Sequence, residues 1–405
     1  MRSRVQTRLL AATLALTAGA AAPAASFPRS DFEANPAEAG WSLGHHPHQT
    51  PKGSWIDTTS ASGRHALRVE KGWWASPRFE VEPFACYRLR FAAAAEGKAY
   101  WSVQFFDAAG RVLAADHYAS IYPSEEWRSY EFCFRSRLKA ATAEVRFQAM
   151  ATPLLVDDAA VEPISRPDVA RWADRIYAAI PPIDAQAVPP PSKLLARTLA
   201  RLRKGGTLRI VLLGDSIMND TGNSAFDVLI ERLYPRARIE LIHSVRGGTG
   251  CPYYRRENRV QSYVLDLEPD LLIIGGISNG HDPEAIRDVV RQVRARSDPD
   301  ILVLSGAVAP WELFLDYVRK LPAEKRQPAI ERAKHYRPRL ARMAAEEKVA
   351  TLDIRALWDA YVERIRKPPM WLRRDPPHAN ARGHQVLARI LAAYFAPREG
   401  GDAAP

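Results

Sequence analysis

A serine, a histidine and an aspartate stand in positions from which they could act together on an ester. Ser216 directly follows an apolar run and a Gly-Asp pair, and Asp375 precedes His378 by three residues. A serine hydroxyl is too weakly acidic to attack an ester unaided, so it needs an adjacent base, and that base needs a carboxylate to fix its tautomer. Two prolines between Asp375 and His378 would stiffen a turn that presents the carboxylate to the ring. The spacing therefore predicts Ser216 as nucleophile, His378 as base and Asp375 as its orienting acid.

An acyl-transfer site also needs donors for the negative charge that develops on the carbonyl oxygen. The sequence offers the backbone N–H of Ser216, the backbone N–H of Gly247 or Gly248, and the side-chain amide of Asn279. We predict an oxyanion hole of Ser216, Gly247 and Asn279. Gly248 is the alternative glycine and a candidate substrate contact.

Other polar residues near these positions have two interpretations. His281 follows Asn279 closely and could contact substrate or pack, while Arg373, with Arg374 beside it, could orient an anionic substrate or be surface charge. We expect His384, in the last helical segment, to cap or pack. Three polar residues after the nucleophile could line an acyl pocket, but we expect them to cap the next helix: Asn219, Asp220 and Asn223.

The elements that position these residues alternate between strand and helix. Five apolar runs indicate buried strands: 208–213, 238–242, 270–274, 300–304 and 349–352. Among the segments between them, 282–296 is the clearest helix, with Asp282 as N-cap and Pro283 as its first residue. Repeated units of this kind build a parallel sheet covered by helices on both faces, a three-layer α/β/α domain of flavodoxin-like type. Ligands of such folds bind beyond the carboxyl ends of the strands, where the candidate residues stand.

The sequence blocks around these candidates resemble those of the GDSL, or SGNH, hydrolases over about 208–395. The residues that match the family's nucleophile, glycine, amide donor and Asp-x-x-His pair are, in that order, Ser216, Gly247, Asn279, Asp375 and His378. The third block continues with Gly280 where Asp is common in the family, which leaves the amide in place. The resemblance implies a serine esterase fold that uses no metal or other cofactor in catalysis.

The N-terminal half has the pattern of an all-β sandwich. Short runs rich in Val, Phe, Tyr and Trp recur over 65–156 and mostly alternate polar with apolar side chains. Phe32-Glu33, Trp127 and the closing run 156–161 resemble the jelly-roll carbohydrate-binding modules of secreted polysaccharide-active enzymes. We therefore expect a jelly-roll domain before the α/β domain.

The same resemblance implies ligand sites in this half. A structural calcium would be held by Glu33 and by Asp157 or Asp158, since that ion prefers hard oxygen ligands. We expect the histidine-rich segment 45–48 to be a solvated loop and not a metal site. Four tryptophans could stack on sugar rings or pack in the core: Trp41, Trp55, Trp73 and Trp74.

Domain boundaries follow from changes in composition. Residues 1–25 carry three arginines before an apolar run that ends on small residues, which predicts a secretory signal peptide and an exported protein, periplasmic or extracellular. The sandwich takes 26–164, and 165–205 form a helical and then proline-rich linker, predicted to be a stiff spacer. The hydrolase-like domain takes 206–397, and 398–405 form a disordered tail. After signal cleavage we expect no membrane segment, because no other stretch approaches the ~20 apolar residues of a span.

Composition narrows the class of partner. The 405 residues are 47% hydrophobic and 25% charged, which excludes wholesale disorder and collagen. Most of the net charge of +11 lies beyond residue 164, where it could attract an anionic partner or form solvated surface. No nucleic-acid partner is expected, because no recognition motif accompanies the charge. Cys86 and Cys133 could form a disulfide in an exported protein or remain two buried thiols, and Cys251 is left over.

These observations predict a secreted serine esterase that removes acetyl or similar short acyl groups from a polysaccharide. Three other functions fit the same pattern: a glycan O-acyltransferase, a lipid esterase or thioesterase, and a carbohydrate-binding protein with an inactive hydrolase-like half. A lipid esterase should carry an apolar lid, and no long apolar insertion separates the blocks. The sequence does not identify the polysaccharide, the acyl group or the oligomeric state.

Overall fold

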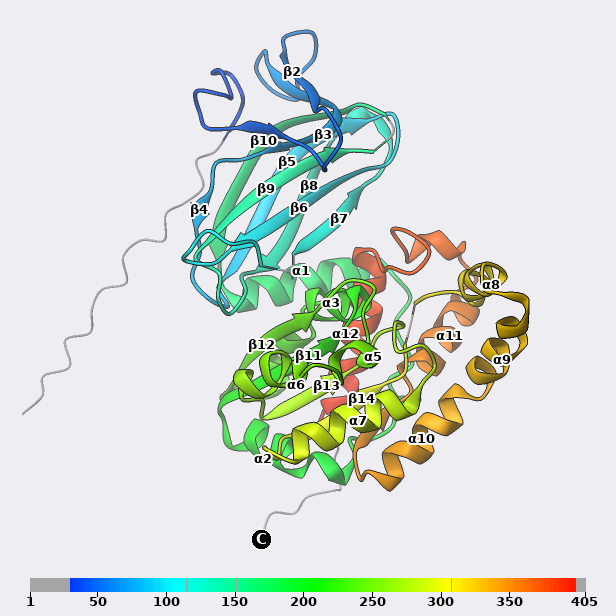
Figure 1. Ribbon diagram of the computed structural model, residues 1–405. Coiled ribbons are helices and arrows are strands. Elements are labelled where there is room, and N and C mark those ends of the chain that lie inside the picture. Colours follow the sequence, from blue (N-terminus) through cyan, green and yellow to red (C-terminus); the bar gives the residue numbers. More distant parts are fainter. Residues whose placement is uncertain (1–29, 114–115, 151, 307, 398–405) are drawn as a thin grey trace, which may run out of the picture.

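The computed structural model describes residues 30–397 apart from 114–115, 151 and 307. Within that range the chain forms an antiparallel β-sandwich followed by an α/β domain, and the two lie end to end (Figure 1). The predicted signal peptide, 1–25, and the predicted tail, 398–405, lie outside the described residues.

The sandwich is built from ten strands in two layers. These are β1 (Ser42–Gly44), β2 (Lys52–Ile56), β3 (Ala66–Ala75), β4 (Phe79–Glu80), β5 (Cys86–Ala95), β6 (Ala99–Phe106), β7 (His117–Ile121), β8 (Ser124–Arg135), β9 (Thr142–Ala149) and β10 (Leu154–Ile164). The first half of β3 pairs with β2 and β10, and its second half pairs with β1 and β9. Gly72, with φ of 81°, stands where β3 passes from one layer to the other, a conformation that glycine adopts without steric cost. Between the layers lies an aromatic core that includes Trp101, Phe105 and Phe147, none of them exposed to solvent.

The α/β domain has a five-stranded parallel sheet in the order β12-β11-β13-β14-β15. The strands are β11 (Gly206–Gly214), β12 (Ala237–Val245), β13 (Leu271–Ile274), β14 (Asp300–Leu304) and β15 (Ala350–Leu352). Alternate residues of β11 enter different cores: Ile210 and Leu212 on one face, Val211 and Leu213 on the other. Both faces are therefore buried, as the continuous apolar runs of the sequence predict. The strand order reverses beside β11, which places a binding crevice at its carboxyl end.

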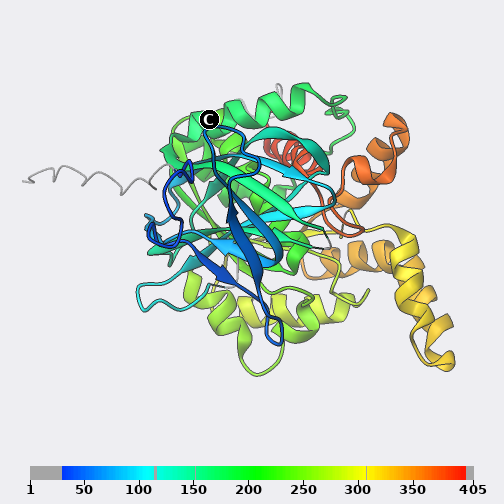
Figure 2. The same cartoon turned by 90° about the horizontal axis from the view of Figure 1, so that it is seen from above.

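Helices cover both faces of this sheet. They are α1 (Arg166–Ala178), α2 (Ala196–Lys204), α3 (Ser216–Asn223), α4 (Phe226–Leu233), α5 (Cys251–Tyr254), α6 (Arg259–Tyr263), α7 (Pro283–Arg294), α8 (Trp311–Arg319), α9 (Ala323–Lys334), α10 (Tyr336–Glu346), α11 (Ile354–Ile365) and α12 (Ala381–Phe395), with short 3-10 turns at Lys193–Leu195, Leu265–Leu267 and Pro369–Trp371. Helices α1, α4, α11 and α12 bury one face, and α5, α6, α7 and α10 bury the other. The predicted cap of α7 is present, since the Asp282 side chain accepts the Glu284 N–H at 3.0 Å. Viewed from above, α8 and α9 extend beyond the layers (Figure 2).

The segment 165–205 is packed, and the prediction of a stiff spacer there is wrong. Helix α1 buries Trp172 in the core of the α/β domain, and Trp172 Nε1 donates to the carbonyl of Glu131 on β8. Further along, Val188 is 1% exposed, and the Tyr361 hydroxyl donates to the carbonyl of Pro181 at 2.7 Å. The prolines give an extended backbone, but this backbone lies along α11 and α12 and does not separate the domains.

Charged side chains join the two domains in a buried interface. Arg135 at the end of β8 forms an ion pair with Asp227 of α4, and Arg166 of α1 binds the other oxygen of the same carboxylate at 2.7 Å. Arg137 Nη2 donates to Asn223 Oδ1 at 2.8 Å. Removal of one partner from a buried pair of this type typically costs about 3–5 kcal/mol, so the domains are expected to stay docked.

The three cysteines are separate buried thiols. Cys86 stands opposite Arg135 and Cys133 stands opposite Arg88 on the paired strands β5 and β8, so the two cysteines are not cross-strand partners. Burial raises the pKa of the Cys133 thiol to about 12. Of the two alternatives, the structure has the two thiols. No helix within the described part of the chain combines the length and the apolar character that a bilayer crossing requires.

Candidate functional site

The predicted nucleophile stands at the first position of α3, directly beyond the carboxyl end of β11. Asp215 caps this helix, since its Oδ1 accepts the N–H of Ile217 at 2.9 Å. Its Oδ2 accepts the N–H groups of Ile277 and Ser278, both at 2.7 Å, in the loop after β13. One buried carboxylate thus fixes the turn that carries Ser216 against the third sequence block.

A chain of hydrogen bonds connects Ser216, His378 and Asp375. Ser216 Oγ lies 2.8 Å from His378 Nε2, and His378 Nδ1 lies 2.7 Å from Asp375 Oδ1. Asp375 Oδ1 also accepts the backbone N–H of His378 at 3.1 Å, which closes the turn expected from the spacing. The structure therefore brings together the three residues singled out in the sequence.

The electrostatics of this turn keep Asp375 ionised. Partial burial alone would raise its pKa, but the hydrogen bond and charge of His378 and the nearby guanidinium of Arg374 hold the pKa below its usual value. Arg374 Nε lies 3.9 Å from Asp375 Oδ2. A carboxylate kept ionised beside the ring fixes the tautomer with Nε2 free to take a proton from Ser216.

Arg374 is neither surface charge nor a substrate contact but is 2% exposed behind the triad. Its Nη1 reaches both oxygens of Asp220, at 2.9 and 2.8 Å, and the carbonyl of Ala379 at 2.8 Å. Burial would raise the pKa of Asp220, but the charges of Arg374 and His384 outweigh it and lower the pKa to about 2. His384, on α12, is 5% exposed, and its Nε2 lies 3.8 Å from Asp220 Oδ1, so it belongs to this buried polar cluster and does not cap the helix.

The polar residues after the nucleophile were expected to cap the next helix, but they do not. Asp220 binds Arg374, while Asn219 Nδ2 donates to the carbonyl of Asp116 at 2.8 Å and Asn219 Oδ1 lies 2.9 Å from His243 Nδ1. Asn223 contacts the same carbonyl and Arg137. Asn219 and Asn223 thus bind groups of the sandwich, whereas Asp220 binds an arginine of the α/β domain itself.

The predicted oxyanion donors surround the amino end of α3. Asn279 is 2% exposed; its Oδ1 accepts the N–H of Cys251 at 2.8 Å, and its Nδ2 donates to the carbonyl of Gly275 at 3.2 Å. Gly247 and Gly248 form the centre of a turn closed by the bond from Thr249 N–H to the Arg246 carbonyl. Gly248 has φ of 64°, which favours glycine at that position. A Cβ on either glycine would contact nothing within 4 Å, so this loop lies open.

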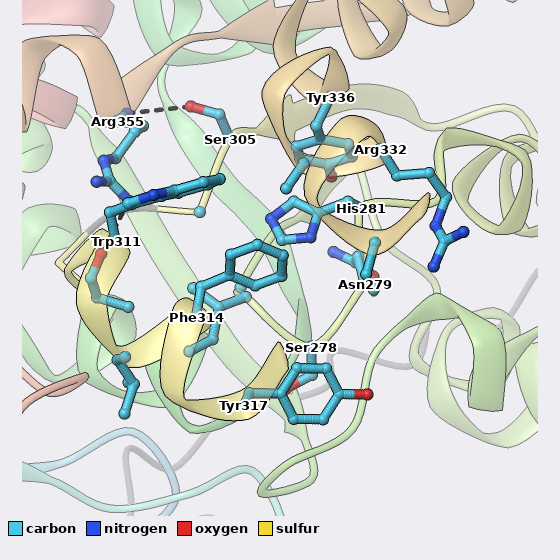
Figure 3. A pocket seen from close by; sticks show the side chains of 18 of the residues that line it. Ser278, Asn279, His281, Ser305, Trp311, Phe314, Tyr317, Arg332, Tyr336 and Arg355 are labelled. Carbon is cyan, nitrogen blue, oxygen red and sulfur yellow. Dashed lines mark hydrogen bonds between the residues drawn. The ribbon is translucent and has the colours of Figure 1, made fainter. Parts of the chain in front are cut away.

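A cavity of about 700 Å³ opens beside these donors. Its wall includes Gly248, Asn279, His281 and the aromatic side chains of α8, as Figure 3 shows for the labelled residues. His281 therefore belongs to this wall, where its ring meets Phe314 edge-on at 4.8 Å. Arg373, by contrast, is 9% exposed and is not among the residues that line the cavity.

Helices α8 and α9 form an insertion between β14 and α10 that the sequence analysis missed. Trp311, Phe314 and Tyr317 recur every third residue of α8 and face the cavity. The apolar residues are interspersed with charges, so no long apolar run marks the insertion. The sequence does lack a long apolar insertion, as expected, but three aromatic side chains of α8 still cover one side of the cavity.

Two residues of the sandwich contact the catalytic turn, although nothing in their sequence neighbourhood signals it. Lys98 Nζ donates to the carbonyl of Arg374, and the Arg374 guanidinium carbon lies 4.0 Å from the centre of the Tyr118 ring. Tyr118 also meets Tyr100 edge-on at 5.7 Å. The sandwich thus forms part of the surroundings of Asp375 and His378.

The calcium site implied for the sandwich does not fit the residues present. Glu33 Oε1 accepts the N–H groups of Arg64 and His65, both at 2.8 Å, and Asp157 Oδ2 accepts those of Ala61 and Ser62. The remaining oxygens face His65 Nδ1 and the N–H of Asp158. Nitrogen donors thus occupy the positions that a cation would need. Across the described residues, no group of three His, Cys, Asp or Glu side chains is placed to hold a metal ion.

The four candidate tryptophans divide between core and surface. Trp41 and Trp74 are 3% and 7% exposed and pack in the sandwich core. Trp55 is 38% exposed and stacks on His65. Trp73 lies on the outward face, where Arg146 is 4.9 Å from the centre of its ring.

Comparisons with known proteins give one family match and several similar structures. Residues 212–386 match the model of the GDSL-like Lipase/Acylhydrolase family. A comparison with curated proteins gives no match.

Among solved structures, the chain is similar to a two-domain esterase active on acetylated mannans, with 18% identity and a TM-score of 0.40 over 55% of this chain and 60% of that one. It is also similar to the CBM22-1 xylan-binding domain of Paenibacillus barcinonensis Xyn10C, with 12% identity and a TM-score of 0.28 over 36% and 99%. A third likeness is to tailspike protein 4 of bacteriophage CBA120, with 14% identity and a TM-score of 0.28 over 31% and 19%. The chain thus spans less than two thirds of the tailspike and esterase chains.

The strand order and the family match agree for the C-terminal part of the chain. The parallel order β12-β11-β13-β14-β15 is that of a flavodoxin-like sheet, and the matched range contains Ser216, Asn279, Asp375 and His378. Residues 212–386 therefore match the GDSL-like Lipase/Acylhydrolase family model in sequence, and they carry the serine, amide and Asp-x-x-His turn described above.

Proposed function

We propose that the protein hydrolyses acyl esters carried by a polysaccharide, with Ser216, His378 and Asp375 as its catalytic residues. The observation that carries this proposal is the unbroken hydrogen-bond chain from Ser216 Oγ through the His378 ring to Asp375 Oδ1. Ser216 is partly exposed at a strand end, so a substrate can reach it. The buried side chains around it hold its position before substrate binds.

In the first half of the reaction, Ser216 Oγ attacks the ester carbonyl carbon and its proton passes to His378 Nε2. The resulting oxyanion accepts hydrogen bonds from the Ser216 N–H, from Gly247 or Gly248, and from the second N–H of the Asn279 amide. The bond to the sugar oxygen then breaks, and His378 returns the proton to that oxygen. In the second half, water attacks the acyl carbon and gives a proton to His378. The bond from the acyl carbon to Ser216 Oγ then breaks, His378 returns the proton to Ser216 Oγ, and the carboxylic acid is released.

A polysaccharide substrate is supported by the outward face of the sandwich. Cross-strand pairing places Trp73, Gln148 and Tyr100 in one row on β3, β9 and β6. Tyr118 on β7 pairs with Ser102, two residues along from this row, and its ring contacts that of Tyr100 at 5.7 Å. Tyr118 touches Arg374 beside the triad. Rings and amides that run towards a catalytic serine suit a polymer of sugar units, because an aromatic ring complements the apolar face of a pyranose.

Ester release from acylated polysaccharides tests the proposal. The protein should release free acid from at least one member of a panel of acylated plant, algal and bacterial polymers, in proportion to the ester lost from the polymer. Ser216→Ala, which removes only a small partly exposed hydroxyl, should stay folded and lose about 10⁴- to 10⁶-fold in turnover. Loss of polymer ester without free acid, with the acyl group recovered on a second glycan, would show an acyltransferase instead. Undiminished activity in Ser216→Ala would refute the mechanism.

A further inference from the structure

The cavity beside Asn279 lies on a defined side of the triad. It borders Gly248 and Asn279, but neither Ser216 nor His378 belongs to its wall. The sugar oxygen that leaves must lie against His378, because it takes its proton from Nε2. The carbonyl oxygen must point to the oxyanion donors. The remaining substituent of the carbonyl carbon, the acyl chain, is the one that can enter the cavity.

The size of the cavity does not suit an acetyl group. Its volume of about 700 Å³ lies within the roughly 300–1,000 Å³ typical of sites that enclose a whole small molecule. A two-carbon acyl group would leave most of that space without contacts. The cavity therefore fits a much larger acyl group.

Aromatic rings form the side of the cavity that α8 supplies. Trp311, Phe314 and Tyr317 are spaced three residues apart along α8 and face the cavity (Figure 3). The side chains of Trp311 and Tyr317 remain 37% and 59% exposed. His281 lies between Phe314 and Tyr336 with its ring edge-on to both, at 4.8 and 5.2 Å. A flat ring that entered this wall would find edge-to-face and stacked partners, which contribute beyond simple apolar burial.

Polar groups also line the cavity and disfavour a purely aliphatic occupant. Arg332 and Arg355 both contribute to the wall, and Arg355 Nε binds Asp359 at 2.6 Å. Burial and these two guanidiniums lower the pKa of His281, so its ring is neutral and can accept or donate a hydrogen bond. A hydrocarbon chain would remove these groups from water without offering a partner, which is unfavourable. An aromatic ring with a hydroxyl substituent satisfies both kinds of wall.

We propose that this cavity, lined on one side by α8 and α9, receives the acyl group of the substrate, and that this acyl group is a hydroxylated aromatic acid of the hydroxycinnamoyl or hydroxybenzoyl class. The proposal rests on the ester hydrolysis proposed above. It replaces the acetyl group expected from the sequence. It also gives the α8–α9 insertion a role in substrate selection, because α8 carries the three rings that would contact the acyl group.

Methyl esters that differ only in the acyl group test this assignment on the full chain. We expect kcat/KM for methyl 4-hydroxy-3-methoxycinnamate to exceed that for methyl acetate and for methyl octanoate by at least about tenfold, the range of several ring contacts combined. Trp311→Ala and Phe314→Leu should each lower the cinnamate-to-acetate ratio about threefold to tenfold. Phe314→Leu keeps apolar volume and removes only the ring. Leu233→Ala, at a residue 39% exposed on α4 and outside the cavity wall, should leave the ratio unchanged.

The outcomes separate this inference from the proposed function. If acetate is the best substrate and the α8 variants leave the ratio unchanged, the cavity assignment is wrong while ester hydrolysis stands. A preference for octanoate would mean an aliphatic pocket and would equally overturn it. If no ester of the series is hydrolysed in a way that depends on Ser216, the proposed function itself fails.

Discussion

The guanidinium of Arg374 lies over the ring of Tyr118, 4.0 Å from its centre, so a residue of the sandwich supports the turn that carries Asp375 and His378. Asp220 binds the guanidinium of Arg374 as well, and the backbone carbonyl of Arg374 accepts a hydrogen bond from Lys98 Nζ. The sandwich thus contacts the turn that carries the proposed catalytic residues. This relationship predicts that changes in the N-terminal domain affect hydrolysis of small soluble esters.

Tyr118→Ala should lower kcat on a small ester by about 2- to 30-fold, because a cation–π contact of a partly buried pair is worth about 0.5–2 kcal/mol. KM should change less, since Tyr118 would act as a positioning residue for the catalytic turn. Tyr118→Phe keeps the ring but loses the hydroxyl that also interacts with Arg374, so it should retain more of kcat than Tyr118→Ala. Steady-state kinetics of the three proteins, with thermal unfolding as a folding control, measure this. An equal loss in the Phe variant would assign the effect to the hydroxyl and not to the ring.

A fragment that begins at Pro190 should be poorly soluble or inactive, although it contains every residue of the triad. It would lack α1 and the sandwich. Their removal would expose the apolar face of α4. It would also leave Asp227, which is 0% exposed in the full chain, without its partners Arg135 and Arg166. A fragment that begins at Ser165 restores α1 and Arg166 and should be more soluble. Soluble yield and turnover of a small ester compare the two. Full activity of the shorter fragment would show that the domains are independent.

The proximity of Ser216, His378 and Asp375 could be predicted from the sequence because each of these residues belongs to a short local pattern. Ser216 and Asn279 follow apolar runs that become parallel strands, and the Asp375–His378 turn has its own spacing. Parallel strands bring such residues to one edge whatever the lengths of the connecting helices. Local patterns were therefore enough to predict that residues far apart in the sequence lie close together.

Features that depend on docking could not be found in this way. Lys98 and Tyr118 reach the catalytic turn only because the sandwich packs against α3, and no periodicity encodes that contact. The proline-rich segment is a second example. Its composition predicts an extended backbone but does not predict the surface against which that backbone packs. Charge likewise gave no location for Arg374, because a buried arginine and a surface arginine look the same in sequence.

Acid should destabilise the fold through Asp220. Its pKa of about 2 in the folded protein lies below the ordinary 3.8, so the unfolded chain takes up the proton first as the pH falls. This stabilisation is fully present above about pH 4 and is lost as the pH falls through about 2, and it amounts to about 2 kcal/mol.

Urea unfolding at pH 5 and pH 2.5 measures this contribution. Asp220→Asn should be less stable than the wild type at pH 5 but should lose less stability between the two pH values. Asp57→Asn, which changes an exposed carboxylate, should lose stability with pH as the wild type does. Parallel pH dependence of Asp220→Asn and wild type would contradict the assignment.

Asn279 tests whether the amide takes part in the reaction, and the structure dictates which substitution to use. Asn279→Ala would remove the oxygen that accepts the buried Cys251 N–H, so a loss of activity could reflect a disturbed fold. Asn279→Asp keeps that acceptor and removes both N–H donors. If one of them binds the oxyanion, kcat should fall by at least about 10² to 10³-fold, the usual effect of losing one such donor. KM should move far less, because that bond strengthens only as charge develops on the carbonyl oxygen. Unfolding midpoints near that of the wild type would establish that the fold is intact. A raised KM with unchanged kcat would instead identify Asn279 as a residue that binds the substrate in the ground state. The oxyanion would then be bound by Ser216 and the glycine loop alone.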